Sequence, residues 1–262
     1  MRNLLLLFAF LAIPAMTSCT KNDPAPGNGM IADHRCIDLS SIPDEWIEKA
    51  KENLHIAYGH TSHGSQITSG MTGLAGFKGD TYAWNNGGQD GALDLHDYAM
   101  SGDLGNPDFT SWEQKTRTCL DANPHVNVII WSWCGQVSHA SEENINTYLG
   151  LMSGLEEDYP EVTFVYMTGH LDGTGVTGNL NIRNEQIRNY CIANKKFLYD
   201  FADIESYDPD GNYYLDKNAN DGCYYDSDND GSQDANWAIE WQNSHTEGAD
   251  WYACSSAHSQ PL

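Results

Sequence analysis

Positive charge is scarce in this sequence. Lys and Arg together number 13 against 37 Asp and Glu, which leaves a formal net charge of -24 at pH 7. A nucleic acid is also a polyanion, so this chain would repel it rather than recruit it by counterion release. The composition therefore excludes nucleic acid as a partner. Aromatic residues make up 11% of the chain, which is too many for a disordered acidic tail. An acidic, aromatic-rich chain suits an exported protein that handles neutral sugars or divalent cations.

A long hydrophobic run is also missing. The N-terminal apolar stretch, residues 4–13, is too short to span a membrane as a permanent helix. It follows Arg2 and leads into small residues, so residues 1–18 are typical of an export signal. Cys19 directly after them resembles the lipobox of bacterial lipoproteins, in which that thiol is acylated. We expect an exported lipoprotein anchored to a membrane through Cys19, with residues 19–40 as a polar tether. An ordinary cleaved secretory signal is the alternative.

Six further cysteines lack the paired C-x-x-C spacing of a structural zinc site. In an oxidising compartment, an even number of thiols favours disulfides over metal thiolates, although the spacing leaves the pairing open. These cysteines are Cys36, Cys119, Cys134, Cys191, Cys223 and Cys254.

Hydrophobic patterning predicts one α/β domain over residues 41–262. Apolar runs predict buried strands at residues 54–58, 126–131, 162–167 and 196–201. Capping residues and helical spacing predict helices at residues 41–53, from Ser141 to Tyr159, and 181–194. Residues 59–125 are rich in Gly, Asn and Asp and read as loop. Strands that alternate with helices indicate a mostly parallel sheet, so we expect a three-layer α/β/α fold.

Polar clusters follow three of the predicted strands: "GHTSHGSQ" (59–66), "SWCGQVSH" (132–139) and "TGHLDG" (168–173). Parallel sheets place their chemistry at the carboxyl edge of the strands. A serine there becomes a nucleophile when a base accepts its proton and fixed donors stabilise the oxyanion. Ser62 is the candidate and Ser65 its near competitor. The structural alternative is that these hydroxyls cap the next helix.

The order of these blocks, closed by "CSSAHS" at residues 254–259, resembles the SGNH (GDSL-like) hydrolase superfamily. It is more similar to exported members whose first block reads glycine, histidine, any residue, serine. The resemblance covers most of residues 53–258. It implies a three-layer α/β/α fold of flavodoxin type and ester hydrolysis, often the deacetylation of polysaccharides.

The resemblance also implies roles for individual residues. Ser62 would be the nucleophile, Gln136 would replace the third-block asparagine, and His258 would be the general base. The full candidate set is Gly59, His60, Ser62, Gln136 and His258. Two departures stand out. Ser255 occupies the position of the usual acid, and the second-block glycine stays open among Gly87, Gly88 and Gly91.

Two other functions remain open. His60 and His63, with His170 and Asp172, would form a metal site of imidazoles and a carboxylate, although no H-E-x-x-H signature is present. A protein without catalysis is the other alternative, in which a hydrolase-like scaffold binds glycans through its Trp and Tyr side chains in a calcium-dependent manner. Ser255 in the acid position is its best support.

The stretch "DSDNDGSQD", residues 226–234, matches the start of an EF-hand loop, with oxygen-bearing side chains at alternate positions and a glycine at the sixth. Trp237 replaces the glutamate expected at the twelfth position. The stretch therefore resembles the calcium loops of dockerins and thrombospondin type 3 repeats. We expect structural calcium within an acidic insertion at about residues 205–236. The candidate ligands are Asp226, Asp228, Asp230, Ser232 and Asp234.

Overall fold

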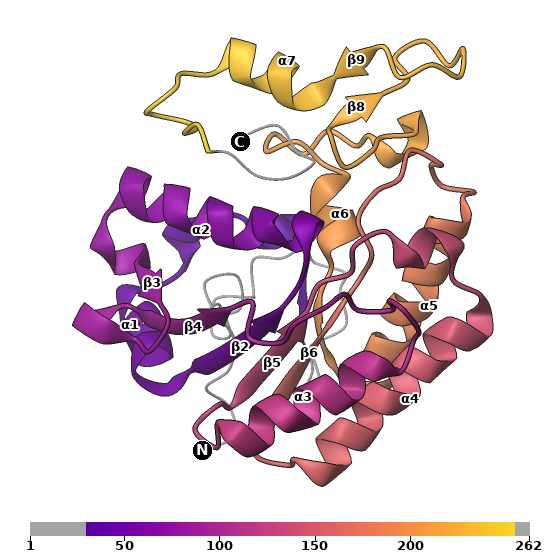
Figure 1. Ribbon diagram of the computed structural model, residues 1–262. Helices are drawn as coiled ribbons and strands as arrows, with labels where there is room; N and C mark the ends of the chain where they lie inside the picture. The colour runs from indigo at the N-terminus through magenta and orange to yellow at the C-terminus, as the bar shows by residue number, and fades with distance from the viewer. Residues whose placement is uncertain (1–29, 255–262) are drawn as a thin grey trace.

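The four apolar runs that predict buried strands all form strands of one parallel sheet. The computed structural model describes residues 30–254 and confirms the three-layer α/β/α fold (Figure 1). The export signal, Cys19, Ser255 and His258 lie outside the described residues.

The central sheet has the strand order β1-β7-β6-β5-β2-β4-β3, and every neighbouring pair is parallel. Its strands are β1 (Ile31–Ala32), β2 (His55–Gly59), β3 (Trp84–Asn85), β4 (Leu93–Asp97), β5 (Val128–Trp131), β6 (Thr163–Met167) and β7 (Phe197–Tyr199). The order β4-β2-β5-β6-β7 is the flavodoxin-like 2-1-3-4-5 order.

Helices cover both faces of this sheet (Figure 1). The buried cluster under one face contains side chains of α1 (Asp44–Asn53), joined by partly buried side chains of α2 (Ser65–Lys78). The cluster under the other face contains side chains of α3 (Ser111–Ala122), α4 (Glu142–Asp158) and α5 (Asn179–Asn194). Both faces of the strands are therefore buried, as the continuous apolar runs indicate.

The best-predicted helix is α4. Ser141 caps it, and its hydroxyl oxygen accepts a hydrogen bond from the backbone N–H of Asn144 at 3.1 Å. The side-chain oxygen of Asn144 accepts a hydrogen bond from the backbone N–H of Ser141 in return, which completes a capping box. The buried side chains recur at helical spacing and face the sheet. They are Ile145, Tyr148, Leu149, Met152 and Leu155.

The prediction of a loop over residues 59–125 is wrong, because this stretch contains α2, β3, β4 and α3. Helix α2 carries glycines that weaken its intrinsic helix propensity. Ile67 and Met71 nevertheless pack on the sheet, and tertiary burial of this kind overrides propensity.

The tether also ends earlier than expected. Ile31 and Ala32 form β1 at the edge of the sheet, paired with Leu198 and Tyr199 of β7. Ala32 is fully buried. Within the described residues the domain therefore begins near Met30 rather than at residue 41.

The acidic insertion folds as a small unit beside the sheet, at the top of Figure 1. It contains an antiparallel pair of strands, β8 (Tyr224–Tyr225) and β9 (Ala235–Asn236), and it lies between α6 (Phe201–Glu205) and α7 (Trp237–Ser244) in the sequence. Its own buried cluster includes Tyr214, Tyr225 and Trp237. The acidic stretch 226–234 is the loop between β8 and β9.

Two further features belong to residues 30–254. No helix there is both long and apolar enough to cross a membrane. Cys119, Cys134, Cys191 and Cys254 carry free thiols there, so the expected disulfides do not form at these four positions.

Candidate functional site

Three loops begin side by side at the carboxyl edge of the sheet, because β2 lies between β4 and β5. The backbone N–H of Ser132, just after β5, donates to the carbonyl oxygen of Gly59 at 2.9 Å. The N–H of Ala99, just after β4, donates to the carbonyl oxygen of Tyr58 at 3.0 Å. After β2 the chain first forms β4 on one side of β2 and later forms β5 on the other side. The strand order reverses at β2, so its carboxyl end is a topological switch point.

The indole of Trp131 lies against Gly59, the last residue of β2. A Cβ atom at this position would lie 2.6 Å from two carbons of that ring. Trp131 is 1% exposed and cannot move aside. The glycine of the first block is thus required by packing between β2 and β5, and it turns the chain into the loop that carries Ser62.

Ser62 is exposed and opens a 3-10 turn, Ser62–Gly64, that leads directly into α2. Its Oγ lies 3.3 Å from Sγ of Cys134, the third residue after β5. The near competitor has a structural role, because Oγ of Ser65 donates a hydrogen bond to the carbonyl oxygen of Ser62 at 2.6 Å. The hydroxyl that stands at the junction of the two loops is therefore that of Ser62.

Gly105 faces Gln136 across this edge. It lies in the loop after β4, with a φ of 81°, and a Cβ atom there would lie 3.1 Å from the Trp133 ring and 3.2 Å from Cβ of Gln136. The side-chain carbonyl oxygen of Gln136 is buried, and within residues 30–254 it accepts no hydrogen bond.

The glycines considered for the second block of the resemblance lie in another connection. Gly87, Gly88 and Gly91 stand between β3 and β4 and precede β4, whose amino end lies away from Ser62. Gly105 follows β4 and lies at the carboxyl edge. Only its left-handed backbone and its close contacts identify it, and neither leaves a local pattern in the sequence.

His60 is a buried support for the first-block loop. It is fully buried, and its Nε2 lies 2.6 Å from Oδ1 of Asp97 at the end of β4. Its ring lies between those of Tyr58 and Tyr98, with centroids at 4.4 Å and 4.0 Å. These contacts join the loop after β2 to the end of β4 and give His60 a structural role.

The rival metal set is wrong in two of its members. His60 pairs with Asp97, and Asp172 caps a local turn, where its Oδ1 accepts hydrogen bonds from the N–H and Oγ1 of Thr174. His63 and His170 do meet, with ring centroids 3.8 Å apart.

Two carboxylates complete the group around His63. Oδ2 of Asp221 lies 3.7 Å from Nδ1 of His63, and Oε1 of Glu205 lies 3.1 Å from its Nε2. Burial opposes a positive charge on this imidazole, but the two carboxylates outweigh burial and raise the pKa of His63 to about 9. The pKa of His170 is lowered, chiefly by burial and then by repulsion from His63. Asp221 belongs to the acidic insertion, yet its carboxylate lies beside His63 and His170.

The acidic loop brings Asp226, Asp228 and Asp230 together, with one carboxylate oxygen of each within 4.8 Å of the others. Gly231 has a φ of 92° and donates its N–H to Oδ2 of Asp226 at 2.9 Å. Asp234 instead accepts a hydrogen bond from the N–H of Ser227. Ser232 donates its hydroxyl and its N–H to Oδ1 of Asp230.

No protein-family model matches the chain, and no curated protein matches it.

Proposed function

We propose that the protein is an exported ester hydrolase of the SGNH type, with Ser62 as its nucleophile. The position of Ser62 carries the proposal. Its exposed hydroxyl stands where the loops after β2 and β5 meet, 3.3 Å from Cys134. In α/β sheets of this order, ligands bind at such a switch point.

The reaction follows from this position. The Ser62 hydroxyl attacks the carbonyl carbon of the ester and gives its proton to the imidazole of His258. The ester C–O bond then breaks, and the alcohol leaves with that proton. Water, deprotonated by the same imidazole, attacks the acyl-serine and releases the acid.

The negative charge on the carbonyl oxygen needs fixed hydrogen-bond donors. The proposed donors are the backbone N–H groups of Ser62 and Gly105 and the side-chain amide of Gln136. Gly105 and Gln136 pack against each other beside the Ser62 loop, since Gln136 follows Cys134 by two residues. The buried carbonyl oxygen of Gln136 accepts no hydrogen bond in the described part of the chain, so that atom does not tie the amide to a structural role.

The proposed substrate class is an ester of a neutral polysaccharide, most simply an acetyl ester. The net charge of -24 repels anionic polymers and leaves neutral ones. Lipidation of Cys19 would hold the enzyme at the outer membrane, on its periplasmic or cell-surface side, where such polymers occur.

The acidic loop is proposed to bind structural calcium. Three carboxylates converge in a turn of the required spacing, with Gly231 in the left-handed conformation. Asp226, Asp228 and Asp230 are the side-chain ligands, and Ser232 and Asp234 complete the loop. The ion would neutralise a cluster of like charges and hold together the hairpin of β8 and β9.

The alternative is a glycan-binding protein without catalysis. It relies on exposed aromatic rings, yet five of the eight Trp residues are buried in the structure. Those that remain partly exposed are Trp46, Trp84 and Trp251. Burial of most indoles removes them as stacking platforms for sugars and leaves this alternative the exposed rings of Tyr98, Tyr213 and Tyr224.

The hydrolase is tested with two serine variants of the full chain on an aryl acetate. Ser62→Ala removes the nucleophile, so hydrolysis should fall by about 10⁴-fold or more. Its melting temperature should stay unchanged, because the hydroxyl is exposed. Ser65→Ala is the matched control and should keep activity within about tenfold, since it removes one hydrogen bond and no reacting group. Full activity of Ser62→Ala would remove the assignment. Glycan binding by a wild type that hydrolyses nothing would support the alternative.

A further inference from the structure

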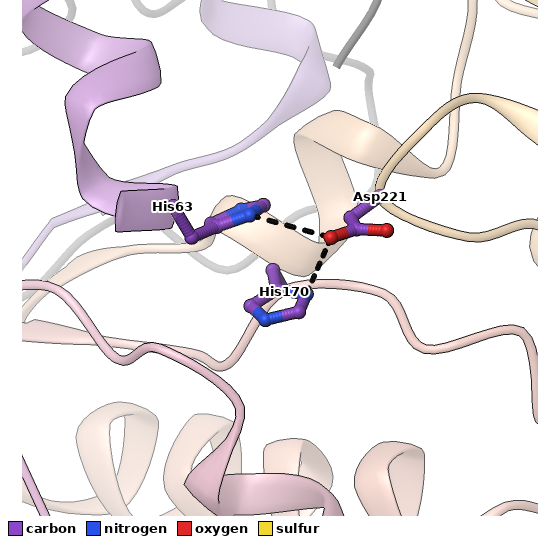
Figure 2. Close-up of side chains that lie close together, drawn as sticks. All are labelled: His63, His170 and Asp221. Carbon is purple, nitrogen blue, oxygen red and sulfur yellow. Dashed lines mark ion pairs between the residues drawn. The ribbon is translucent and has the colours of Figure 1, made fainter. Parts of the chain in front are cut away.

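Three segments that are distant in the sequence bring nitrogen and oxygen donors to one point (Figure 2). His63 lies in the turn before α2, His170 in the loop after β6, and Asp221 in the insertion. Nδ1 of His63 and Nδ1 of His170 both face Oδ2 of Asp221, at 3.7 Å and 3.6 Å. One carboxylate oxygen is thus shared between two imidazoles.

These two distances are informative. They are too long for hydrogen bonds, whose N···O separation is about 2.7–3.2 Å. They are close to the separation of two ligands on one tetrahedral ion, because metal–ligand bonds of about 2.0–2.2 Å place neighbouring ligand atoms about 3.3–3.6 Å apart. A small contraction around an ion brings all three donor atoms into its coordination sphere.

Glu205 orients His63 for this role. Its Oε1 lies 3.1 Å from Nε2 of His63, and its Oε2 accepts a hydrogen bond from the backbone N–H of Leu171 at 2.8 Å. An ion displaces the hydrogen on Nδ1 of His63, and a carboxylate held in this way keeps the other ring hydrogen on Nε2. Metal-binding histidines commonly have such a carboxylate partner.

The backbone holds the other two donors in place. The N–H of Asp221 donates to the carbonyl oxygen of Leu171 at 3.2 Å, and Asp172 forms an isolated β-bridge with Asn220. The residues that follow His170 are therefore joined to those that carry Asp221. The Nδ1–H of His170 donates a hydrogen bond to the carbonyl oxygen of Leu171 at 2.9 Å, so binding of an ion at Nδ1 breaks this bond and moves the ring hydrogen to Nε2.

We propose that His63, His170 and Asp221 bind one divalent transition-metal ion, zinc by donor chemistry, with Glu205 as the carboxylate that orients His63. Imidazole nitrogens favour zinc over calcium, which takes oxygen ligands. Glu205 and Asp221 also line a cavity of about 670 Å³, which gives an ion and its water a route to the site. This site goes beyond ester hydrolysis and does not depend on it.

A second group of donors, Asp33, His34 and Asp203, is less suited to a metal. The carboxylate of Asp33 pairs with the guanidinium of Arg35, at 2.5 Å between Oδ2 and Nη2. A cation already neutralises this carboxylate, so the group serves as an internal control.

The ion would join three segments next to the proposed nucleophile. His63 directly follows Ser62, so a metal on its Nδ1 fixes the turn that presents the Ser62 hydroxyl. The insertion would be fixed to the sheet through Asp221 at the same time. The expected effect is on stability and on the position of Ser62, and the ion is assigned no step in the reaction.

The test uses the full chain without an affinity tag, stripped of metal by a chelator and supplied with excess calcium to fill the acidic loop. Zinc is added, and the bound metal is measured by mass spectrometry after gel filtration. Cobalt(II) serves as a spectroscopic probe, because nitrogen ligands in a tetrahedral site give strong visible absorption bands. The variants are His170→Gln, Asp221→Asn and Glu205→Gln, and the matched controls are His34→Gln and His139→Gln.

We expect one equivalent of zinc in the wild type and in both controls. Affinity should fall about tenfold to a hundredfold in Glu205→Gln, which keeps the shape of the side chain, and at least as much in His170→Gln and Asp221→Asn. Zinc should raise the melting temperature of the wild type and not that of His170→Gln. The proposal is overturned if no saturable zinc binding occurs, if these variants bind like the wild type, or if His34→Gln abolishes binding.

Discussion

Gly105 offers a sharp test of the oxyanion donors, because the same loop contains a matched control. Gly105→Ala places a side chain on a backbone with a φ of 81°, a conformation that costs an L-residue about 1–2 kcal/mol. The new Cβ would also lie 3.1 Å from the ring of Trp133, which is 1% exposed, and 3.2 Å from Cβ of Gln136. Overpacking of this kind adds about 1 kcal/mol or more, so the total loss of stability should be about 2–3 kcal/mol.

Gly102→Ala carries the same backbone strain without these contacts. Its φ is 105°, and the new Cβ would meet only the end of the flexible Lys115 side chain. The expected loss is therefore about 1–2 kcal/mol. Urea unfolding of both variants, followed by circular dichroism, measures the two losses.

Activity separates the two variants more clearly than stability does. A shift of the Gly105 backbone displaces the proposed oxyanion donor, so kcat for an aryl acetate should fall about tenfold to a hundredfold, whereas Gly102→Ala should keep its kcat. Equal kcat values for the two variants, with Gly105→Ala still folded, would refute the placement of Gly105 in the oxyanion site.

Two further predictions concern packing and the acidic loop. Gly59→Ala should destabilise the protein by about 2–4 kcal/mol in urea unfolding, because its Cβ meets the buried Trp131 ring at 2.6 Å. Gly76→Ala on α2 is the control, because its new Cβ meets nothing within 4 Å, and it should stabilise the protein by about 0.5 kcal/mol. Equal losses of stability in Gly59→Ala and Gly76→Ala would contradict the packing of β2 on β5. Removal of calcium should lower the melting temperature of the wild type. Asp228→Asn should reduce that calcium-dependent shift. A wild-type melting temperature that does not change with calcium would rule out an ion in the loop.

The central strands and α4 were predictable because their signals are local. The runs that became β2, β5, β6 and β7 are apolar on both faces, and Ser141 carries the cap of α4 in its own side chain. The carboxyl edge was also predictable, since three polar clusters follow strands that pair side by side. Strands β1 and β3 contain only two residues each and leave no periodic pattern.

Helices α2 and α3 were missed for different reasons. Glycines in α2 hide a helix that exists because one face packs on the sheet. The signal of α3 was present, since Trp112, Thr116, Cys119 and Leu120 recur at helical spacing and are buried. The high Gly, Asn and Asp content of residues 59–125 hides that signal.

The candidate site divides in the same way. Ser62 and Gln136 were found because each belongs to a short block directly after a strand. Gly105 and Asp221 come from loops and Glu205 from the end of α6, and only the fold brings these segments to that edge. The pairing of His63 with Asp221 joins the loop after β2 to the acidic insertion near the end of the chain. No spacing within a local stretch could therefore indicate it.

Covalent labelling tests the proposed nucleophile most directly. A fluorophosphonate reacts with an activated serine, and peptide mapping by mass spectrometry locates the modified residue. The predicted result is a single modification on Ser62 in the full chain, retained in Ser65→Ala and absent in Ser62→Ala. A chain that stays unlabelled, or that carries the label on Ser65, would contradict the assignment of Ser62 as the reacting group.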